Sequence, residues 1–248
     1  MRNASSILVR IVLLIPLAFS IQALAGPKQV LIFSGGWKGH FPQETAVWMQ
    51  SALENAGFEV TRSDSLSCLD NVESLKMYDL IIPNWTAGEI NTTQLKNLSD
   101  AVKSGAGLAG VHGGMGDAFR DTPEYEAMVG GQFLKHPYVG EYRVDRVVLN
   151  HPVMKDVPES FVYRSEHYFM RVSTNVTVLA DSDYSSETPG LRMPVVWVKT
   201  WGKGRVFYSA LGHNVEKEYA TYPDAWTMFI NGSLWAARVI EKRPENEF

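Results

Sequence analysis

The sequence predicts an α/β fold: a three-layer sandwich with a mostly parallel central sheet and an added β-rich second half. Two apolar runs, residues 29–34 and 79–84, lack regular polar alternation, which is typical of strands buried on both faces of a parallel sheet. Helical patterns alternate with these runs, and this order implies right-handed crossovers between parallel strands. In the second half, alternating polar and apolar positions indicate half-exposed strands.

The elements of the first half follow in a regular order. The strand at 29–34 leads through a Gly-rich loop into a helix that Pro42 opens and Gly57 ends. The inward stripe of this helix consists of Ala46, Val47, Met49, Ala52 and Leu53. Strands are predicted at 58–61 and 79–84, a helix from Thr92 to Lys103, and then a strand that ends at His112.

The second half is predicted to consist mainly of strands. Residues 142–149 and 176–180 alternate, and residues 194–199 and 205–210 form a hairpin through Trp201–Gly204. A final helix from Pro223 to Val239 carries apolar residues that can pack on the sheet. A charged tail, 241–248, ends the chain.

Residues 1–25 have the pattern of an export signal. Arg2 and Arg10 give a basic start, residues 11–19 form an apolar run too short to span a bilayer, and Ala23-Leu24-Ala25 is a small-x-small cleavage pattern. We expect cleavage after Ala25, a single domain over residues 26–248, and a periplasmic or secreted protein. An uncleaved N-terminal anchor is the alternative.

Composition excludes several kinds of partner and site. Without the two arginines of the signal, 21 basic side chains face 27 acidic ones, with no basic cluster. We therefore expect no nucleic-acid partner, and no stable membrane insertion after signal cleavage. Cys68 is the only cysteine, so the chain has neither an internal disulfide nor a thiolate zinc site.

The segment Gly110-Val111-His112-Gly113-Gly114 is the strongest indication of a functional site. Small residues around a central side chain at a strand end have the shape of a nucleophile elbow, which pushes that side chain into a cleft. The central residue here is a histidine, which rules out ordinary covalent acyl chemistry at this position. Because ligands bind beyond the carboxyl ends of parallel strands, His40, Asn84-Trp85 and His112 are expected to face one cleft.

Six motifs in order give the chain a family resemblance. They are Ser34-Gly35-Gly36 with His40, Gly110–Gly114, Gly130-Gly131-Gln132-Phe133 with His136-Pro137, Ser165-Glu166-His167-Tyr168, Pro194–Trp197, and Gly204–Tyr208 with Leu211-Gly212-His213. Through these six motifs the chain resembles the ThuA-like (trehalose-utilisation) proteins of the class I glutamine amidotransferase-like superfamily. The resemblance implies a flavodoxin-like sandwich and a link to trehalose and keto-sugar use.

The resemblance also indicates which chemistry is absent. In the glutamine amidotransferases the elbow residue is a cysteine, and a histidine after a late strand is its base. His112 occupies the cysteine position and His213 resembles the partner histidine. An imidazole cannot replace a thiolate in forming a stable acyl intermediate, so we expect no glutaminase activity.

The candidate site residues combine imidazoles with one carboxylate. We expect His112, His213 and Glu166 to be catalytic. Glu166 and His167 are adjacent, so only one of them can point into the cleft from a strand, and the family pattern favours Glu166. The remaining candidates, predicted to bind substrate, are His40, Trp37, Trp85, His136 and Tyr168.

Two mechanisms remain open for these residues. His112, His136 and His213 could hold a divalent ion such as zinc, which polarises a sugar carbonyl or hydroxyl. Without a metal, a histidine and Glu166 could act as a general acid/base pair beside a carbonyl. No nucleotide cofactor is expected.

The leading functional hypothesis is an exported enzyme that acts on a small carbohydrate. The substrate would be a keto-sugar or glycoside, and the reaction that of a lyase, isomerase or hydrolase. One rival is a non-catalytic carbohydrate-binding or sensing protein on the same fold. A weaker rival is a hydrolase using Ser34 or Ser165 with His213, although neither serine lies in an elbow. The exact substrate and the oligomeric state stay open.

Overall fold

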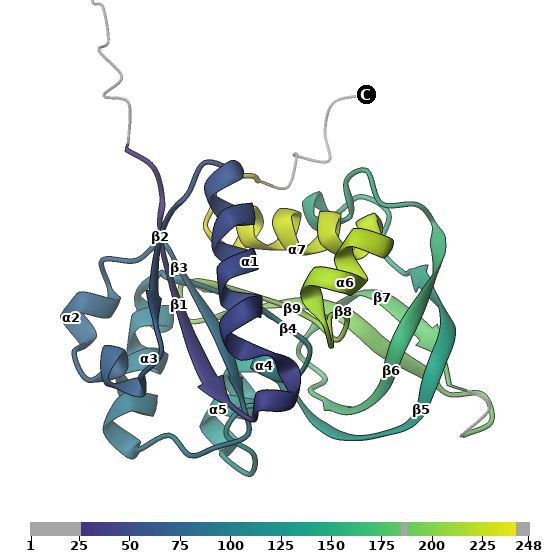
Figure 1. Cartoon of the computed structure of the whole chain (residues 1–248), viewed down its shortest axis with the longest axis horizontal. Helices are drawn as coiled ribbons and strands as arrows, with labels where there is room; N and C mark the ends of the chain where they lie inside the picture. Colours follow the sequence, from purple (N-terminus) through teal and green to yellow (C-terminus); the bar gives the residue numbers. More distant parts are fainter. Residues whose placement is uncertain (1–25, 185–187, 242–248) are drawn as a thin grey trace, which may run out of the picture.

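The computed structural model describes residues 26–184 and 188–241, and their strands form one sheet (Figure 1). The predicted export signal and residues 242–248 of the predicted tail lie outside the described residues. The strands are β1 (Gln29–Gly36), β2 (Glu59–Ser63), β3 (Leu80–Thr86), β4 (Gly107–Val111), β5 (Gly131–Arg146), β6 (Ser160–Val172), β7 (Thr177–Asp183), β8 (Arg192–Trp201) and β9 (Gly204–Ser209). The α-helices are α1 (Pro42–Asn55), α2 (Val72–Leu75), α3 (Thr92–Ser104), α4 (His112–Gly116), α5 (Pro123–Val129), α6 (Val215–Thr221) and α7 (Pro223–Ala236).

The sheet is mixed, so the prediction of a mostly parallel sheet was wrong. Its order is β2-β1-β3-β4-β9-β8-β7-β5-β6. The pairs from β2 to β9 are parallel, and those from β9 to β6 are antiparallel. The reason lies at β9, which pairs with β4 on one side and forms a hairpin with β8 on the other. The β-rich half thereby extends the same sheet.

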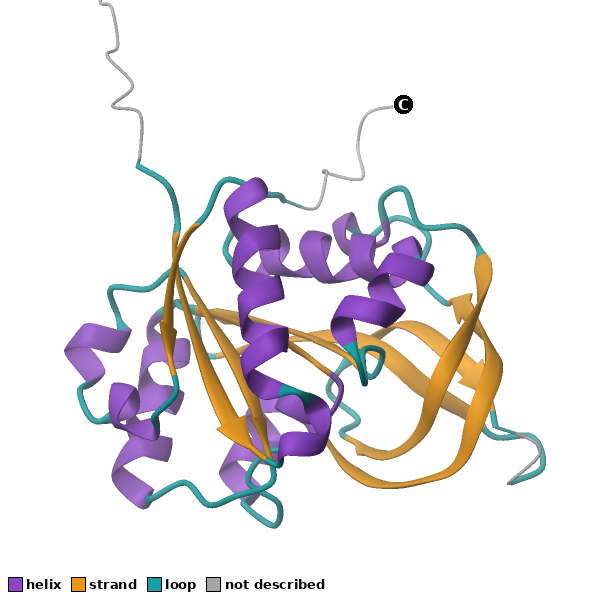
Figure 2. Cartoon of the chain, in the orientation of Figure 1, coloured by secondary structure: helices purple, strands orange, loops and turns teal. Residues whose placement is uncertain are grey.

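Helices cover both faces of the parallel part (Figure 2). On β9, a Cβ added to Gly204 would meet the α3 carbonyl of Val102, whereas Phe207 packs against Gly232 of α7. Residues 204 and 207 point to opposite faces of a strand, so α3 and α7 lie on opposite sides. Helices α1 and α6 contact each other and α6 contacts α7, while α2 and α5 contact α3. The α/β sandwich expected from the first half is present here.

The predicted strand at 142–149 overlaps only the last part of a much longer strand, which ends at Arg146. β5 begins at Gly131 and contains Pro137, a residue that cannot donate a backbone hydrogen bond. Pairing with β6 shifts register between Phe133 and Lys135 and again before Tyr138, and such bulges accommodate proline within a strand. In Figure 1, β5 and β6 curl at the side of the molecule opposite β2. This curl is what brings β6 towards the ends of the parallel strands.

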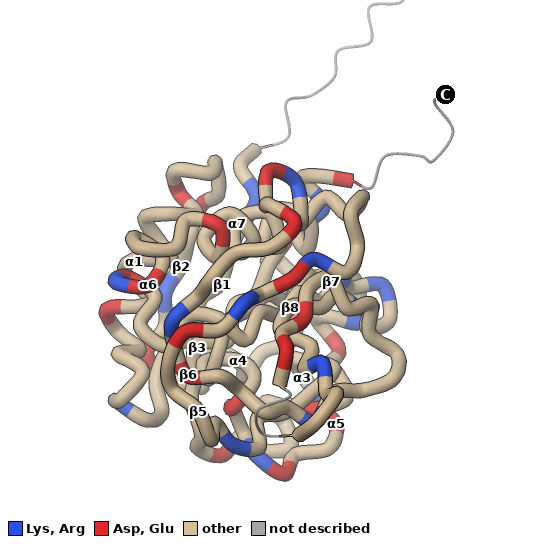
Figure 3. The backbone as a smooth tube through the Cα atoms, turned by 90° about the vertical axis from the view of Figure 1, so that its right-hand side faces the viewer, with Lys and Arg blue, Asp and Glu red and all other residues tan. Residues whose placement is uncertain are grey.

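Charged residues are intermixed on the surface. Figure 3 shows basic and acidic positions side by side on the face that carries β7 and β8. Here the Arg192 guanidinium lies 2.6 Å from Asp145 Oδ2 and also pairs with Asp181. Among the described residues, no helix is both long enough and apolar enough to cross a bilayer.

The contact between α7 and β9 gives a direct test of the packing. Gly232→Ala would place a Cβ 2.5 Å from ring atoms of Phe207, which is fully buried. We expect a loss of about 1–3 kcal/mol in the free energy of unfolding from overpacking, although alanine favours a helix by about 1 kcal/mol. Urea denaturation measures the change, and the added Phe207→Leu substitution should recover most of it. A gain of about 1 kcal/mol, the full effect of helix propensity with no overpacking loss, would contradict this packing.

Candidate functional site

The predicted elbow is present at the end of β4. His112 is the first residue of α4 and has a left-handed backbone with φ of 45°, a strained conformation for a side chain with a Cβ. The neighbouring glycines are needed for close packing. A Cβ on Gly110 would lie 2.6 Å from Met115 Cβ, and one on Gly114 would lie 2.8 Å from Asn84 Oδ1.

His112 is buried, which corrects the expectation that the elbow pushes it into an open cleft. The residue is 1% exposed, because the Tyr168 ring stacks on its imidazole with ring centroids 3.9 Å apart. The Tyr208 hydroxyl donates to the His112 carbonyl at 3.1 Å and thereby stabilises the turn. The elbow therefore aims its side chain at other protein groups.

Two contacts fix the orientation of the His112 ring. Its Nδ1 donates to the Ala210 carbonyl at 2.9 Å; because a carbonyl oxygen only accepts, this nitrogen carries a hydrogen. Its Nε2 lies 3.3 Å from Glu166 Oε2. A bare lone pair would repel the carboxylate at that distance, so Nε2 needs either its own proton or a metal cation that both atoms bind.

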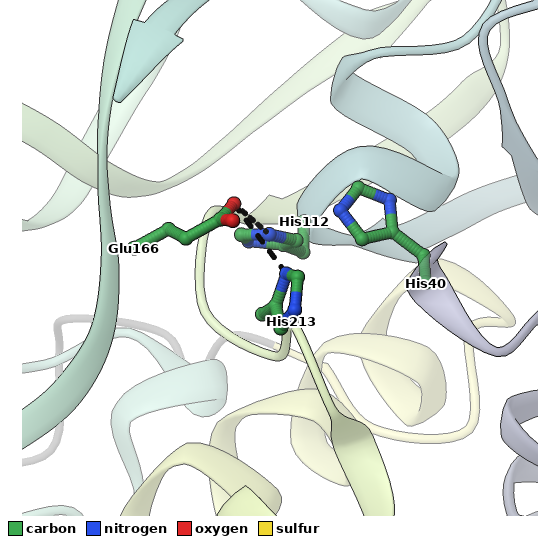
Figure 4. A group of neighbouring side chains, drawn as sticks. All are labelled: His40, His112, Glu166 and His213. Carbon is green, nitrogen blue, oxygen red and sulfur yellow. Dashed lines mark hydrogen bonds and ion pairs between the residues drawn. The ribbon is translucent and has the colours of Figure 1, made fainter. Parts of the chain in front are cut away.

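Four residues from distant parts of the chain meet at this point. His40, His112, Glu166 and His213 each offer one ligand atom, and these atoms lie within 4.8 Å of one another (Figure 4). The Nδ1 of His213 lies 3.4 Å from the same Glu166 Oε2 that faces His112. This nitrogen is buried and makes no hydrogen bond of good geometry. We call these residues the four-residue cluster.

His40 belongs to the cluster through the short 3-10 helix Lys38–His40. Its ring packs edge-on against His112 and His213, with centroids 5.0 and 4.9 Å apart. Its Nδ1 is hydrogen-bonded to Thr86 Oγ1 at 2.7 Å, which leaves Nε2 as the ligand atom. Burial, with help from the two neighbouring imidazoles, lowers the pKa of His40 to about 3, so this ring is neutral near pH 7.

Glu166 and His213 stabilise each other as an ion pair. Burial works to raise the pKa of the Glu166 carboxyl, but the close contacts with His112 and His213 and the charges of these rings outweigh it and hold that pKa well below its usual range. The same contact with Glu166 raises the pKa of His213. An anionic Glu166 is thus favoured, as a cation ligand requires.

A cavity of about 300 Å³ lies against the cluster. Five of the predicted site residues line it: Trp37, His40, His136, Glu166 and Tyr168. His112 and His213 are not among the lining residues. Glu166 therefore stands between the cavity and these two imidazoles. A ligand in the cavity would meet Glu166 and His40 first.

Two predicted residues lie elsewhere than expected. Trp85 does not line the cavity, because alternation along β3 turns it away from Thr86, and its ring lies against Gly35 and Gly88. His136, predicted as a metal ligand, is outside the four-residue cluster. Among the cluster residues it contacts only Glu166, whose Oε1 lies 3.7 Å from its Nε2. It does so from the exposed stretch 134–139 of β5. His40 takes the place in the cluster that we had assigned to His136.

The choice between Glu166 and His167 follows from strand geometry. Glu166 points to the cluster, while the His167 ring lies between Tyr142 and Tyr184, with centroids 4.1 and 4.4 Å away.

The two serines that we considered as alternative nucleophiles are engaged in other contacts. Ser34 Oγ accepts from Asn84 Nδ2 at 3.3 Å, and Ser165 Oγ donates to Glu218 at 2.8 Å.

Sequence reasoning did not identify the polar wall of the cavity. Arg120 lines it beside Phe133, and its guanidinium is held by a two-point ion pair with Asp117, which is 3% exposed. Thr86, which bonds His40, was also missed. The opposite charges of Asp117 and Arg120, three residues apart, were the available signal, and the turn after α4 brings them together.

Comparisons with known proteins agree with this architecture. A family model described as trehalose utilisation (ThuA) matches residues 29–236. A solved protein from Parabacteroides merdae, described as ThuA-like, superposes with a TM-score of 0.70 and 21% identity, covering 89% of this chain and 94% of that one. A second ThuA-like protein, from Bacteroides uniformis, gives 0.69 and 21%, covering 87% and 93%. No curated protein matches the sequence.

The fold also occurs inside a larger enzyme. A β-galactosidase from Rahnella sp. R3 superposes with a TM-score of 0.56 and 15% identity, over 89% of this chain and 33% of that one. At such identities the superpositions show a shared fold and nothing about a shared site.

The lowered pKa of His40 predicts acid sensitivity of the metal-free protein. Between the ordinary value of 6.5 and the folded value of about 3, the unfolded chain binds a proton that the folded chain excludes. Stability is therefore complete above about pH 6.5 and is lost progressively as the pH falls towards 3. In urea titrations with EDTA, lowering the pH from 7.5 to 4.5 should cost the wild type on the order of 2 kcal/mol more than His40→Gln. An equal loss in both proteins would show that His40 does not exclude the proton.

Proposed function

The chain belongs to the trehalose-utilisation (ThuA) family, which is related to carbohydrate utilisation, and from this premise we propose that it is a carbohydrate-processing enzyme. Its substrate is a small sugar or glycoside, in particular one oxidised to a keto form. The observation that carries the proposal is the convergence of three imidazoles and one carboxylate within 4.8 Å of one another beside a cavity. Perturbed titratable groups gathered at a pocket are the usual mark of an active site.

The lining of the cavity supports a sugar as the ligand. The Trp37 side chain is 56% exposed at the rim, where an aromatic ring can stack on the apolar face of a sugar. Arg120, fixed by Asp117, offers its remaining N–H groups to hydroxyl or carbonyl oxygens. A volume of about 300 Å³ suits a small ligand.

The four-residue cluster is the proposed site for a divalent ion such as zinc. Nitrogen and carboxylate ligands are those that zinc prefers. The second ring nitrogens of two histidines are occupied, by the Ala210 carbonyl and by Thr86 Oγ1, as is usual for metal-binding imidazoles. The buried, unbonded Nδ1 of His213 also suits a ligand atom. When bound, the ion would supply Lewis-acid polarisation of a sugar carbonyl or hydroxyl.

Proton transfer is assigned to His136 in this proposal. Glu166 has a strongly lowered pKa and is therefore a poor base near neutral pH. His136 lines the cavity, its side chain is 41% exposed, and Glu166 Oε1 lies 3.7 Å from its Nε2. It can exchange protons with both ligand and solvent, while Glu166 keeps its ring in place.

We further propose that residues 1–25 direct export.

The first test is the metal content of protein purified without chelators. We expect about one zinc or similar ion per chain in the wild type, and loss of that metal in His112→Ala and Glu166→Ala. Elemental analysis measures the content. Turnover of 3-keto-glycosides should fall by ~100-fold or more with the metal, because a bound ion contributes several kcal/mol of transition-state stabilisation. His151→Gln is the control, since it removes a histidine that packs against Trp235, outside the cluster. A metal-free but fully active wild type would overturn the metal-assisted version. Sugar binding with no product would favour the non-catalytic rival.

The second test separates proton transfer from metal binding. His136→Gln should retain the metal, because His136 lies outside the cluster. Turnover should nevertheless fall by about 10²- to 10⁴-fold, as is usual when a general acid or base is removed. Steady-state rates and metal content are measured on the same preparation. A variant with wild-type turnover would show that His136 transfers no proton.

A further inference from the structure

The Glu218 carboxylate on α6 accepts three hydrogen bonds from two different segments. Its Oε2 accepts from the Tyr163 hydroxyl at 2.5 Å and from the backbone N–H of His213 at 3.1 Å. Its Oε1 accepts from the Ser165 hydroxyl at 2.8 Å. Tyr163 and Ser165 belong to β6 and are buried. One carboxylate thereby joins strand β6 to the loop that follows β9.

These two segments carry two members of the four-residue cluster. Ser165 immediately precedes Glu166 on β6, and His213 itself donates to Glu218. Strand alternation places Tyr163 and Ser165 on one face of β6 and Glu166 on the other. Glu218 therefore holds β6 from the face opposite the cluster, while Glu166 meets His213 Nδ1 at 3.4 Å on the cluster side.

Helix α6 is well anchored for this purpose. The Asn214 side chain caps it by accepting from the Lys217 N–H, a contact that stabilises a helix start. The Tyr219 hydroxyl donates to the Leu211 carbonyl at 3.3 Å. The helix and the 211–214 loop are thus tied together on both sides of His213.

We propose that Glu218 is a positioning residue that sets the distance between Glu166 and His213. The inference rests on the proposed function of the four-residue cluster, and it adds a residue that touches neither the ligand atoms nor the cavity lining. The His213 ring packs edge-on against His40 and His112 and lies beside Glu166, but it makes no good hydrogen bond at Nδ1. Because no hydrogen bond fixes the ring itself, the backbone helps to set its position, and Glu218 holds that backbone N–H.

The test compares Glu218→Ala, Glu218→Gln and the control Glu216→Ala. Glu216 lies on the same helix, is exposed, and carries the same charge. Zn²⁺ alone is titrated calorimetrically into chelator-treated protein. Glu218→Ala should bind Zn²⁺ about 10- to 100-fold more weakly, the usual effect of losing an outer-shell partner. Glu216→Ala should bind like the wild type.

Glu218→Gln distinguishes hydrogen bonding from charge. Its amide oxygen can accept from Tyr163 and His213, and its NH₂ group can donate to Ser165 Oγ. We therefore expect it to restore most of the Zn²⁺ affinity. Affinity as low as in Glu218→Ala would overturn the positioning role in favour of a charge effect.

A crystal structure of each variant separates this inference from the proposed function. If the wild type binds no Zn²⁺, the metal proposal fails, but the distance between His213 Nδ1 and Glu166 Oε2 still reports on positioning. In Glu218→Ala this distance should exceed the ~4 Å limit of an ion pair. A folded variant that keeps the wild-type distance would overturn the inference. Should Glu218→Ala fail to fold, Ser165→Ala and Tyr163→Phe each remove one bond to β6, and both are expected to lengthen the same distance.

Discussion

The hydrogen bond from His112 Nδ1 to the Ala210 carbonyl is the contact on which the site depends. It spans the ends of β4 and β9, which pair in parallel up to Val111 and Ser209. The left-handed turn brings the ring to this carbonyl, and the bond fixes which nitrogen faces Glu166. If β9 did not lie beside β4, His112 would have no such acceptor, and His213 would not follow it into the cluster. The pairing of β4 with β9 therefore determines where the site residues lie as well as the order of the strands.

Local sequence signals were sufficient for the parallel part of the fold. The apolar run at 29–34 and the helix start at Pro42 each predict an element that the structure contains. In the antiparallel part, β7 and the hairpin of β8 and β9 were predicted. The start of β5 and the whole of β6 were missed, and β5 carries bulges and Pro137, so its first half shows no regular alternation. Which strand pairs with which is decided by long-range packing, and no short window of sequence contains that information.

The sequence predicted which residues form the site better than it predicted how they are arranged. Residue types and order indicated His112, His213 and Glu166, and these three lie together. The exchange of roles between His40 and His136 was not predictable, because it depends on where the 3-10 helix after β1 lies relative to the curl of β5. Arg120 and Glu218 were missed for a related reason. Their significance comes from partners across the fold, and an arginine or a glutamate alone carries no such signal.

The four-residue cluster draws on positions 40, 112, 166 and 213, so its members are separated by long stretches of chain. Bringing such distant segments together costs loop-closure entropy, which slows the formation of these contacts. A growing chain that has not yet reached residue 213 has only three of the four ligand atoms, and β9 is still missing beside β4. During synthesis the chain can therefore bury much of its first half before it possesses any site. The complete set of four ligand atoms exists only once the segment that carries residue 213 has joined the fold.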